Sequence, residues 1–158
     1  MIAPHKDTAR IHPDVGALAP EAKRALAALT RSGSGIEHRL AELIKARVSQ
    51  INGCAYCVDL HAGALRTDGE HPRRVDALAV WRDSSLFDPA ERAALALAEA
   101  LTALPEGAPP EDTFVEAASH FDEAQIAAIV MTTVAINAWT RFMIATGAEV
   151  PALGPHPD

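Results

Sequence analysis

Apolar side chains recur every three or four residues along most of this 158-residue chain, and Gly, Pro and Asp residues separate one such segment from the next. In the clearest segment, 36–51, one stripe of a helix would collect Ile36, Leu40, Leu43, Ile44, Val48 and Ile51. That spacing is typical of an amphipathic α-helix with one face turned toward a core. No segment of the sequence alternates as a half-buried strand does, so the chain is predicted to be all-α.

The same pattern and its breaks predict the helix boundaries. Two segments begin with the spacing of a capping box, Asp88 with Glu91 and Asp122 with Gln125. The Asn52-Gly53 pair is a turn signal that should fold the second and third helices back on each other as a hairpin. The predicted helices are 20–31, 36–51, 54–67, 72–81, 88–104, 111–120 and a last one from 122 that stops at 147.

The composition agrees with packed helices. Apolar residues make up 49% of the chain but aromatic residues only 4%, whereas a sheet would favour β-branched and aromatic residues. A chain of this length can bury one core, so we expect a single domain over 1–158, with its core at about 20–147 and a peripheral N-terminal arm and C-terminal tail. The final helix is apolar on several sides, which predicts a homo-oligomer.

Charge and hydropathy limit the partners. The formal net charge is −7 and no basic patch stands out, so nucleic acid is not an expected partner. The N-terminal residues lack the apolar run of a signal peptide, and the longest apolar stretch, 126–139, is short for a membrane span. We therefore expect a cytoplasmic protein with no membrane partner. In that compartment a CxxC pair is more often redox-active or metal-binding than a structural staple.

Both cysteines of the chain lie in the segment SQINGCAYCVDLHAGAL at 49–65. On a helix, Cys54, Cys57 and His61 share one face, and the two cysteines are close enough to form a disulfide. The helix N-terminus favours a thiolate, and His61 lies within reach of a hydrogen bond or a bridging water to Cys57. The spacing therefore brings together an activated thiol, a second thiol and a base.

A carboxylate is expected beside this histidine. If the helices on either side of Asn52-Gly53 run antiparallel, Glu42 lies level with about residue 63, next to the height of His61. Glu42 also lies near the apolar stripe of its own helix, so it is expected to be partly buried against the second helix. There it could orient His61 or pass its proton onward.

The combination of Glu42, eleven further residues and then Cys54-x-x-Cys57-x-x-x-His61 resembles the signature of the AhpD-like branch of the carboxymuconolactone decarboxylase superfamily. The stretches RVSQINGCAYCVDLHAGALR, WRDSSLFDPAERAALALAEALT and HFDEAQIAAIVMTTVAINAW resemble its single-domain members, and the likeness covers most of 36–145. It implies an AhpD-like helical bundle, with the CxxC at the N-terminus of a helix in a helical hairpin, that assembles into trimers or hexamers.

The resemblance also implies thiol-based reduction of hydroperoxides without a metal or cofactor. By position, Cys57 would be the attacking thiolate that becomes a sulfenic acid, and Cys54 would resolve it to a disulfide, with His61 and Glu42 as the proton relay. The implied partners are a hydroperoxide or other small oxidant and an unidentified dithiol or protein reductant.

Two positions depart from the family pattern. Tyr56 stands where the best-characterised AhpD enzymes have a second histidine, and Thr140 precedes Arg141 where relatives of this kind tend to carry an asparagine. Asn137 and Arg141 lie one turn apart on the last helix, and we expect a buried contact or a subunit bond from them rather than catalysis.

Other interpretations stay open at the level of sequence. The cysteines could pack as an inert buried pair, or join His61 and Glu42 around a structural zinc, although one helical face makes a poor tetrahedral cage. The function could instead be that of a decarboxylase or isomerase that acts on a lactone by acid–base chemistry, for which no CxxC is needed. A non-enzymatic thiol redox sensor is the third possibility.

Overall fold

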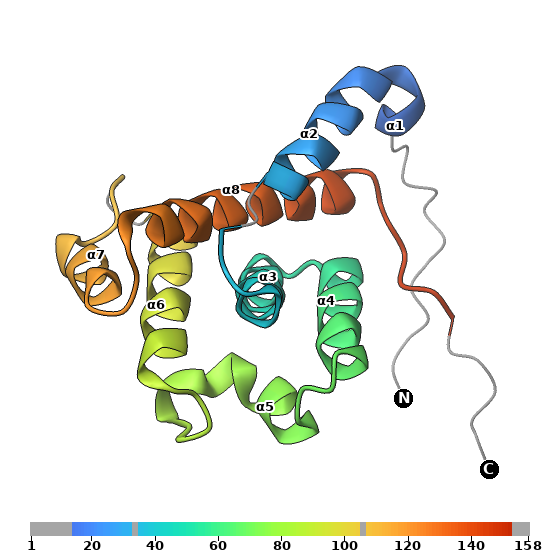
Figure 1. Ribbon diagram of the computed structural model, residues 1–158. Coiled ribbons are helices and arrows are strands. Elements are labelled where there is room, and N and C mark those ends of the chain that lie inside the picture. The colour runs from blue at the N-terminus through green and yellow to red at the C-terminus, as the bar shows by residue number, and fades with distance from the viewer. Residues whose placement is uncertain (1–13, 33–34, 105–106, 153–158) are drawn as a thin grey trace, which may run out of the picture.

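The structure, a computed structural model, describes residues 14–32, 35–104 and 107–152; in these ranges the chain forms eight α-helices and one 3₁₀-helix and no strand (Figure 1). The all-α prediction is confirmed. The elements are α1 (Val15–Leu18), α2 (Pro20–Ser32), α3 (His38–Asn52), α4 (Ala55–Thr67), α5 (Pro72–Ala77), the 3₁₀-helix η1 (Leu78–Asp83), α6 (Pro89–Ala103), α7 (Glu111–Ala118) and α8 (Glu123–Ala145).

Helix α3 is the centre of the fold. Figure 1 views it nearly end-on, with α8 crossing above it, α6 and α4 on either side and α5 beneath. One cluster of buried apolar side chains joins α3 to α6, α7 and α8: Leu40, Ile44, Val48, Ala94, Leu97, Ala98, Ala117, Ile129 and Ile136. A second cluster joins it to α4, α5, η1 and α6: Leu43, Ala46, Leu65, Val75, Leu78, Trp81, Phe87 and Leu95. The stripe predicted for 36–51 therefore lies against the core on two flanks, except for Ile51, which is exposed.

The predicted turn between α3 and α4 is present, and its backbone explains the glycine. Gly53 ends α3 with a φ of +67°, a left-handed conformation that costs glycine little and a β-carbon much more. Cys54 follows as the N-cap residue of α4. Both predicted capping boxes also form, at the starts of α6 and α8.

Two parts of the secondary structure differ from the prediction. The short helix α1 was not predicted, and the single helix predicted for 72–81 is instead α5 followed by η1. The chain leaves helical geometry at Val80, so that Trp81 is buried and its indole N–H donates to Glu99 Oε1 at 2.8 Å. Tertiary contacts of the indole thus override the local helical pattern, which sequence periodicity alone cannot reveal.

Helix α8 carries apolar residues all round and meets α2, α3 and α6 along its length. Among the described residues it is the one helix long and apolar enough to cross a membrane by length and composition. Its apolar window is 39% buried: Ile129, Thr133 and Thr140 are fully buried, whereas Met131, Val134 and Ile144 are exposed. The predicted arm at the N-terminus and most of the C-terminal tail lie outside the described residues, and the single domain over 1–158 stays a prediction.

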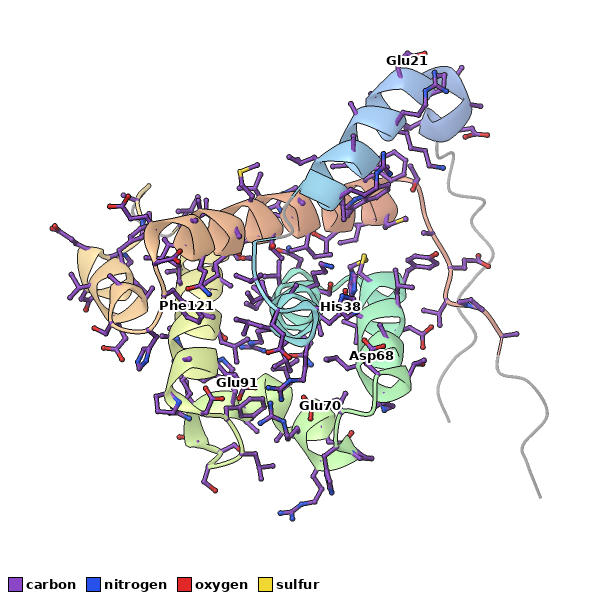
Figure 2. All side chains as sticks on the ribbon, in the orientation of Figure 1. Glu21, His38, Asp68, Glu70, Glu91 and Phe121 are labelled. Atoms are coloured by element: carbon purple, nitrogen blue, oxygen red, sulfur yellow. A yellow bond between two sulfur atoms is a disulfide. The ribbon has the colours of Figure 1, made fainter. Side chains whose placement is uncertain are left out.

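A cluster of buried charges ties the start of α5 to the start of α6. Arg74 donates to Glu70 at 2.9 Å, to Glu91 at 2.5 Å and to the carbonyl oxygen of Leu86, and its guanidinium lies over the ring of Phe87. Glu70 and Glu91 lie near α5 and α6 (Figure 2). Their side chains are only 5% and 6% exposed. Since a carboxylate removed from water needs a partner, this burial depends on Arg74 and on Arg39, which lies 3.4 Å from Glu70 and 3.3 Å from Glu91.

Candidate redox site

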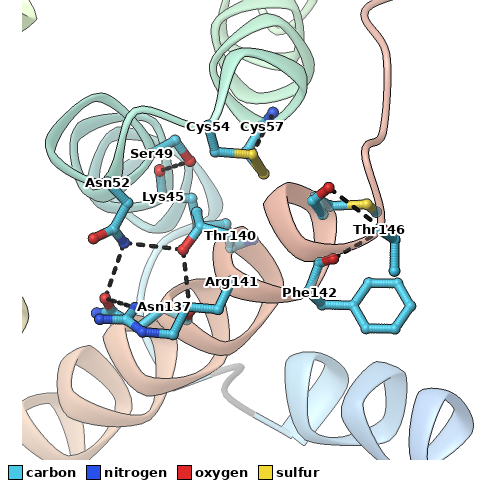
Figure 3. The surroundings of a disulfide bond; sticks show 11 residues. Lys45, Ser49, Asn52, Cys54, Cys57, Asn137, Thr140, Arg141, Phe142 and Thr146 are labelled. Carbon is cyan, nitrogen blue, oxygen red and sulfur yellow. Dashed lines mark hydrogen bonds between the residues drawn. A yellow bond between two sulfur atoms is a disulfide. The ribbon is translucent and has the colours of Figure 1, made fainter. Parts of the chain in front are cut away.

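The hairpin of α3 and α4 places the two cysteines at the beginning of α4, beside α8 (Figure 3). They are joined in a disulfide in this structure, with their Cα atoms 5.3 Å apart and both residues almost completely buried. The Sγ atom of Cys54 accepts a hydrogen bond from the main-chain N–H of Cys57 at 3.3 Å. The prediction that the two sulfur atoms are close enough to bond therefore agrees with the geometry.

The hairpin also brings Glu42 to His61. Glu42 Oε2 lies 2.8 Å from His61 Nδ1, and the two side chains are only 6% and 14% exposed. An ionised carboxylate can only accept hydrogen bonds, so Nδ1 carries the hydrogen and Nε2 is left to take or give a proton. The contact expected from the antiparallel hairpin is present.

A third charged group that sequence analysis missed completes this arrangement. Lys45 Nζ donates to the other oxygen of Glu42, Oε1, at 2.7 Å, and its side chain is 18% exposed. Burial by itself would raise the pKa of the Glu42 carboxyl, but the hydrogen bonds and charges of His61 and Lys45 outweigh it and lower the pKa from 4.5 to about 2. The spacing of three residues between Glu42 and Lys45 on one helix was the available signal.

This lowered pKa predicts that Glu42 stabilises the fold above pH 4.5 and that the contribution is lost as the pH falls from about 4.5 to about 2. A shift of this size corresponds to about 3 kcal/mol. We expect the free energy of unfolding of Glu42→Gln, measured by urea titration between about pH 6 and about pH 3, to fall less steeply with acid than that of the parent. Glu116→Gln, at an exposed position, is the control. Equal slopes for Glu42→Gln and the parent would contradict the assignment.

A cavity of about 550 Å³ opens beside these groups. Its walls come from α2, the start of α3, α4 and α8, and they include Cys57, His61, Lys45 and Tyr56. Cys54 is not among the lining residues, so Cys57 is the cysteine that meets the cavity. A small molecule in this cavity would therefore reach the Cys57 sulfur and the imidazole from the same side.

A polar network holds the turn of the hairpin against α8. Asn52 Nδ2 donates to Asn137 Oδ1 and to Thr140 Oγ1, both at 2.9 Å (Figure 3). Arg141 in turn donates to the side-chain and main-chain oxygens of Asn137. Thr140, one of the two departures from the family pattern, is fully buried, and its hydroxyl both accepts from Asn52 and donates to the carbonyl of Asn137. Asn137 and Arg141 are therefore in contact, but Arg141 is exposed and the contact is not the buried one predicted; the network supports the cysteine turn.

The zinc interpretation finds no support among the residues described. In those ranges no group of three or more His, Cys, Asp and Glu side chains is placed to hold a metal ion.

Comparison with known proteins places this arrangement in a family. The sequence profile of the Carboxymuconolactone decarboxylase family matches residues 15–100. The chain is 40% identical over 114 residues to the uncharacterized protein YdfG of Bacillus subtilis, covering 72% of this chain and 78% of that one. The chain belongs to the carboxymuconolactone decarboxylase family. A second relative, the uncharacterized protein YnjA of Escherichia coli, is 30% identical over 128 residues, covering 80% of this chain and 68% of that one.

Solved structures narrow the assignment to the AhpD-like branch. A protein of unknown function from Agrobacterium tumefaciens, described as a candidate AhpD antioxidant defence protein, superposes with a TM-score of 0.85 at 36% identity over 91% of this chain and 100% of that one. A peroxidase-related protein from Ralstonia eutropha with an AhpD core has the same fold, with a TM-score of 0.76 at 24% identity over 87% of this chain and 74% of that one. The predicted AhpD-like bundle, with the CxxC at the beginning of a hairpin helix, is confirmed.

Proposed function

We propose that the protein is a thiol-dependent hydroperoxide reductase of AhpD type. One observation carries the proposal: Cys57 opens onto a cavity that it shares with His61, whose Nδ1 is hydrogen-bonded to buried Glu42. A thiolate, a proton donor for the leaving group and a second thiol within bonding distance are the groups that two-cysteine peroxide reduction needs.

The reaction would proceed in three balanced steps. The Cys57 thiolate attacks the distal oxygen of the hydroperoxide, the O–O bond breaks, and the alkoxide leaves as an alcohol with a proton supplied through His61. The Cys54 thiol then attacks the Cys57 sulfenic acid, which forms the disulfide and releases water. Finally an external dithiol is oxidised to its own disulfide as it reduces the Cys54–Cys57 bond back to two thiols.

The comparisons support a redox role at a coarser level than this mechanism. The relatives that show the family are uncharacterized, while structural relatives include peroxidase-related proteins. The debrominase Bmp8 shares the fold with a TM-score of 0.76 at 23% identity over 86% of this chain and 74% of that one, a likeness that concerns the fold alone. A cytoplasmic location and assembly into a homo-oligomer, a trimer or a hexamer, belong to the same proposal.

A thiol count tests the proposal most directly. After full reduction we expect two free thiols per chain, and after one equivalent of an organic hydroperoxide we expect none, with one alcohol formed per chain. With a dithiol donor present, the cycle should repeat, and alcohol should form in large excess over protein. Oxidation that stops after one equivalent even with the donor would instead indicate a redox sensor. Turnover of carboxymuconolactone by a Cys54→Ser, Cys57→Ser double variant would indicate the acid–base enzyme.

A further inference from the structure

The charged side chains that line the cavity itself are basic, while the carboxylates of Glu42 and Asp68, which pair with three of them, lie outside its lining. The ionisable side chains that can carry a positive charge and line it are Arg31, His38, Lys45 and His61, and no Asp or Glu belongs to its described lining. This is unusual on a chain whose formal net charge is −7. A positive charge at the wall of a cavity favours an anion over a neutral molecule.

Among these cations, Arg31 is the one whose charge is not already shared. Lys45 and His61 are both hydrogen-bonded to Glu42, and His38 lies 3.0 Å from Asp68 (Figure 2). Within the described ranges Arg31 has no carboxylate partner. An unshared guanidinium at the edge of an apolar cavity is suited to bind a carboxylate through two parallel hydrogen bonds.

The backbone at Arg31 is positioned by its neighbour Thr30. Thr30 accepts a hydrogen bond from the indole N–H of Trp139 at 2.7 Å, which ties the last turn of α2 to α8. Arg31 follows directly, and it is an exposed residue that also belongs to the lining of the cavity. Cys57 stands on a different wall, in α4, so a molecule could meet both groups with its two ends.

The remaining walls suit a hydrocarbon body. Apolar and aromatic side chains from α4, α8 and the segment before α3 line the space: Ile36, Leu60, Ala135, Ile136, Trp139 and Met143. Hydrogen peroxide would fill little of a cavity of about 550 Å³ and could use none of these contacts. Cavities of this size usually take organic molecules with many carbon atoms.

We propose that the preferred substrates are amphipathic organic hydroperoxides that carry a carboxylate, with the carboxylate at Arg31 and the hydroperoxide at Cys57. This inference rests on the proposed function and specifies its substrate class. The chemical step is unchanged: the Cys57 thiolate takes the distal oxygen, and the hydroxy acid leaves with a proton from His61.

Matched substrates test this assignment. We expect kcat/KM for linoleic acid 13-hydroperoxide to exceed that for its methyl ester by roughly tenfold, because one charge-assisted contact is worth about 1.5 kcal/mol. Arg31→Met should bring the ratio of acid to ester to about one. Arg24→Met, which removes the same charge from an exposed position of the same helix outside the cavity lining, should keep the preference.

Binding without turnover separates the two proposals. Dodecanoate and dodecanol, which contain no peroxide, are titrated into Cys57→Ser, with Trp139 fluorescence as the signal and Trp139→Phe as its control. We expect dodecanoate to bind about tenfold more tightly than dodecanol, and Arg31→Met in the same background to remove the difference. Equal kcat/KM for acid and ester, together with equal affinity for the two probes, would contradict the proposed substrate class without contradicting peroxide reduction. Preferential binding of dodecanoate, with no consumption of hydroperoxide by the parent protein, would contradict the proposed reaction but support the carboxylate site.

Discussion

Cys57→Ser is expected to abolish peroxide turnover, lowering the rate by roughly a thousandfold or more, because a serine hydroxyl has neither the acidity nor the nucleophilicity of a thiol. The cavity makes the expectation specific to this cysteine, since Cys57 and not Cys54 belongs to its lining. The measurement is the formation of alcohol from an organic hydroperoxide in the presence of a dithiol donor.

Cys54→Ser is the matched control, because it makes the same substitution at the other cysteine of the pair. It should still react with one equivalent of hydroperoxide but stop at the sulfenic acid of Cys57, which dimedone labels and mass spectrometry detects. If Cys54→Ser loses the first reaction and Cys57→Ser keeps it, the roles of the two cysteines are reversed. If both variants turn over like the parent, thiol-based reduction is wrong.

The hairpin shows why part of the site could be predicted from sequence. A turn at Asn52-Gly53 fixes the antiparallel register, and register decides which residues lie level across two helices. The meeting of Glu42 and His61 follows from that geometry and from the burial expected beside an apolar stripe. Helix starts were predictable for the same reason: a capping box is a local pattern with a local cause.

What sequence could not supply are contacts between distant segments. Thr30 and Trp139 are far apart in the chain, and nothing in either segment signals their hydrogen bond. The same holds for Asn52, which meets Asn137 and Thr140 on α8. The cavity depends on these contacts because α8 supplies much of its apolar wall and the end of α2 forms another side. The reactive groups of the site can therefore be predicted from the sequence of one hairpin, whereas the shape of the cavity is set by the tertiary fold.

The shape of the cavity depends on a stable fold around α3. Arg74→Met tests the contribution of the charge cluster on the side of α3 away from α8 to that stability. Removing Arg74 leaves Glu70 and Glu91 buried without their main partner, and losing one member of a buried ionic cluster typically costs about 3–5 kcal/mol. For a chain of this length the midpoint of thermal unfolding should fall by about 10 °C. Arg73→Met, at the exposed neighbouring position, is the matched control. A loss no larger than that of Arg73→Met would contradict the assignment.

Acid should reduce the difference in the free energy of unfolding between Arg74→Met and the parent. Burial by itself would raise the pKa of the Glu70 carboxyl, but the main-chain N–H of His71 and the hydrogen bond and charge of Arg74, with a contribution from Arg39, lower it below the usual 4.5. A lowered pKa stabilises the folded protein above that value and ceases to do so as the pH falls through the folded-state value. In Arg74→Met the Glu70 carboxyl gains a proton more readily. Its uncompensated negative charge is therefore neutralised at a higher pH in the variant than in the parent. The difference in unfolding free energy between variant and parent, measured by urea titration, should therefore narrow as the solution is acidified below the ordinary pKa of glutamate. A difference that does not depend on pH would show that Arg74 acts through packing on Phe87 instead.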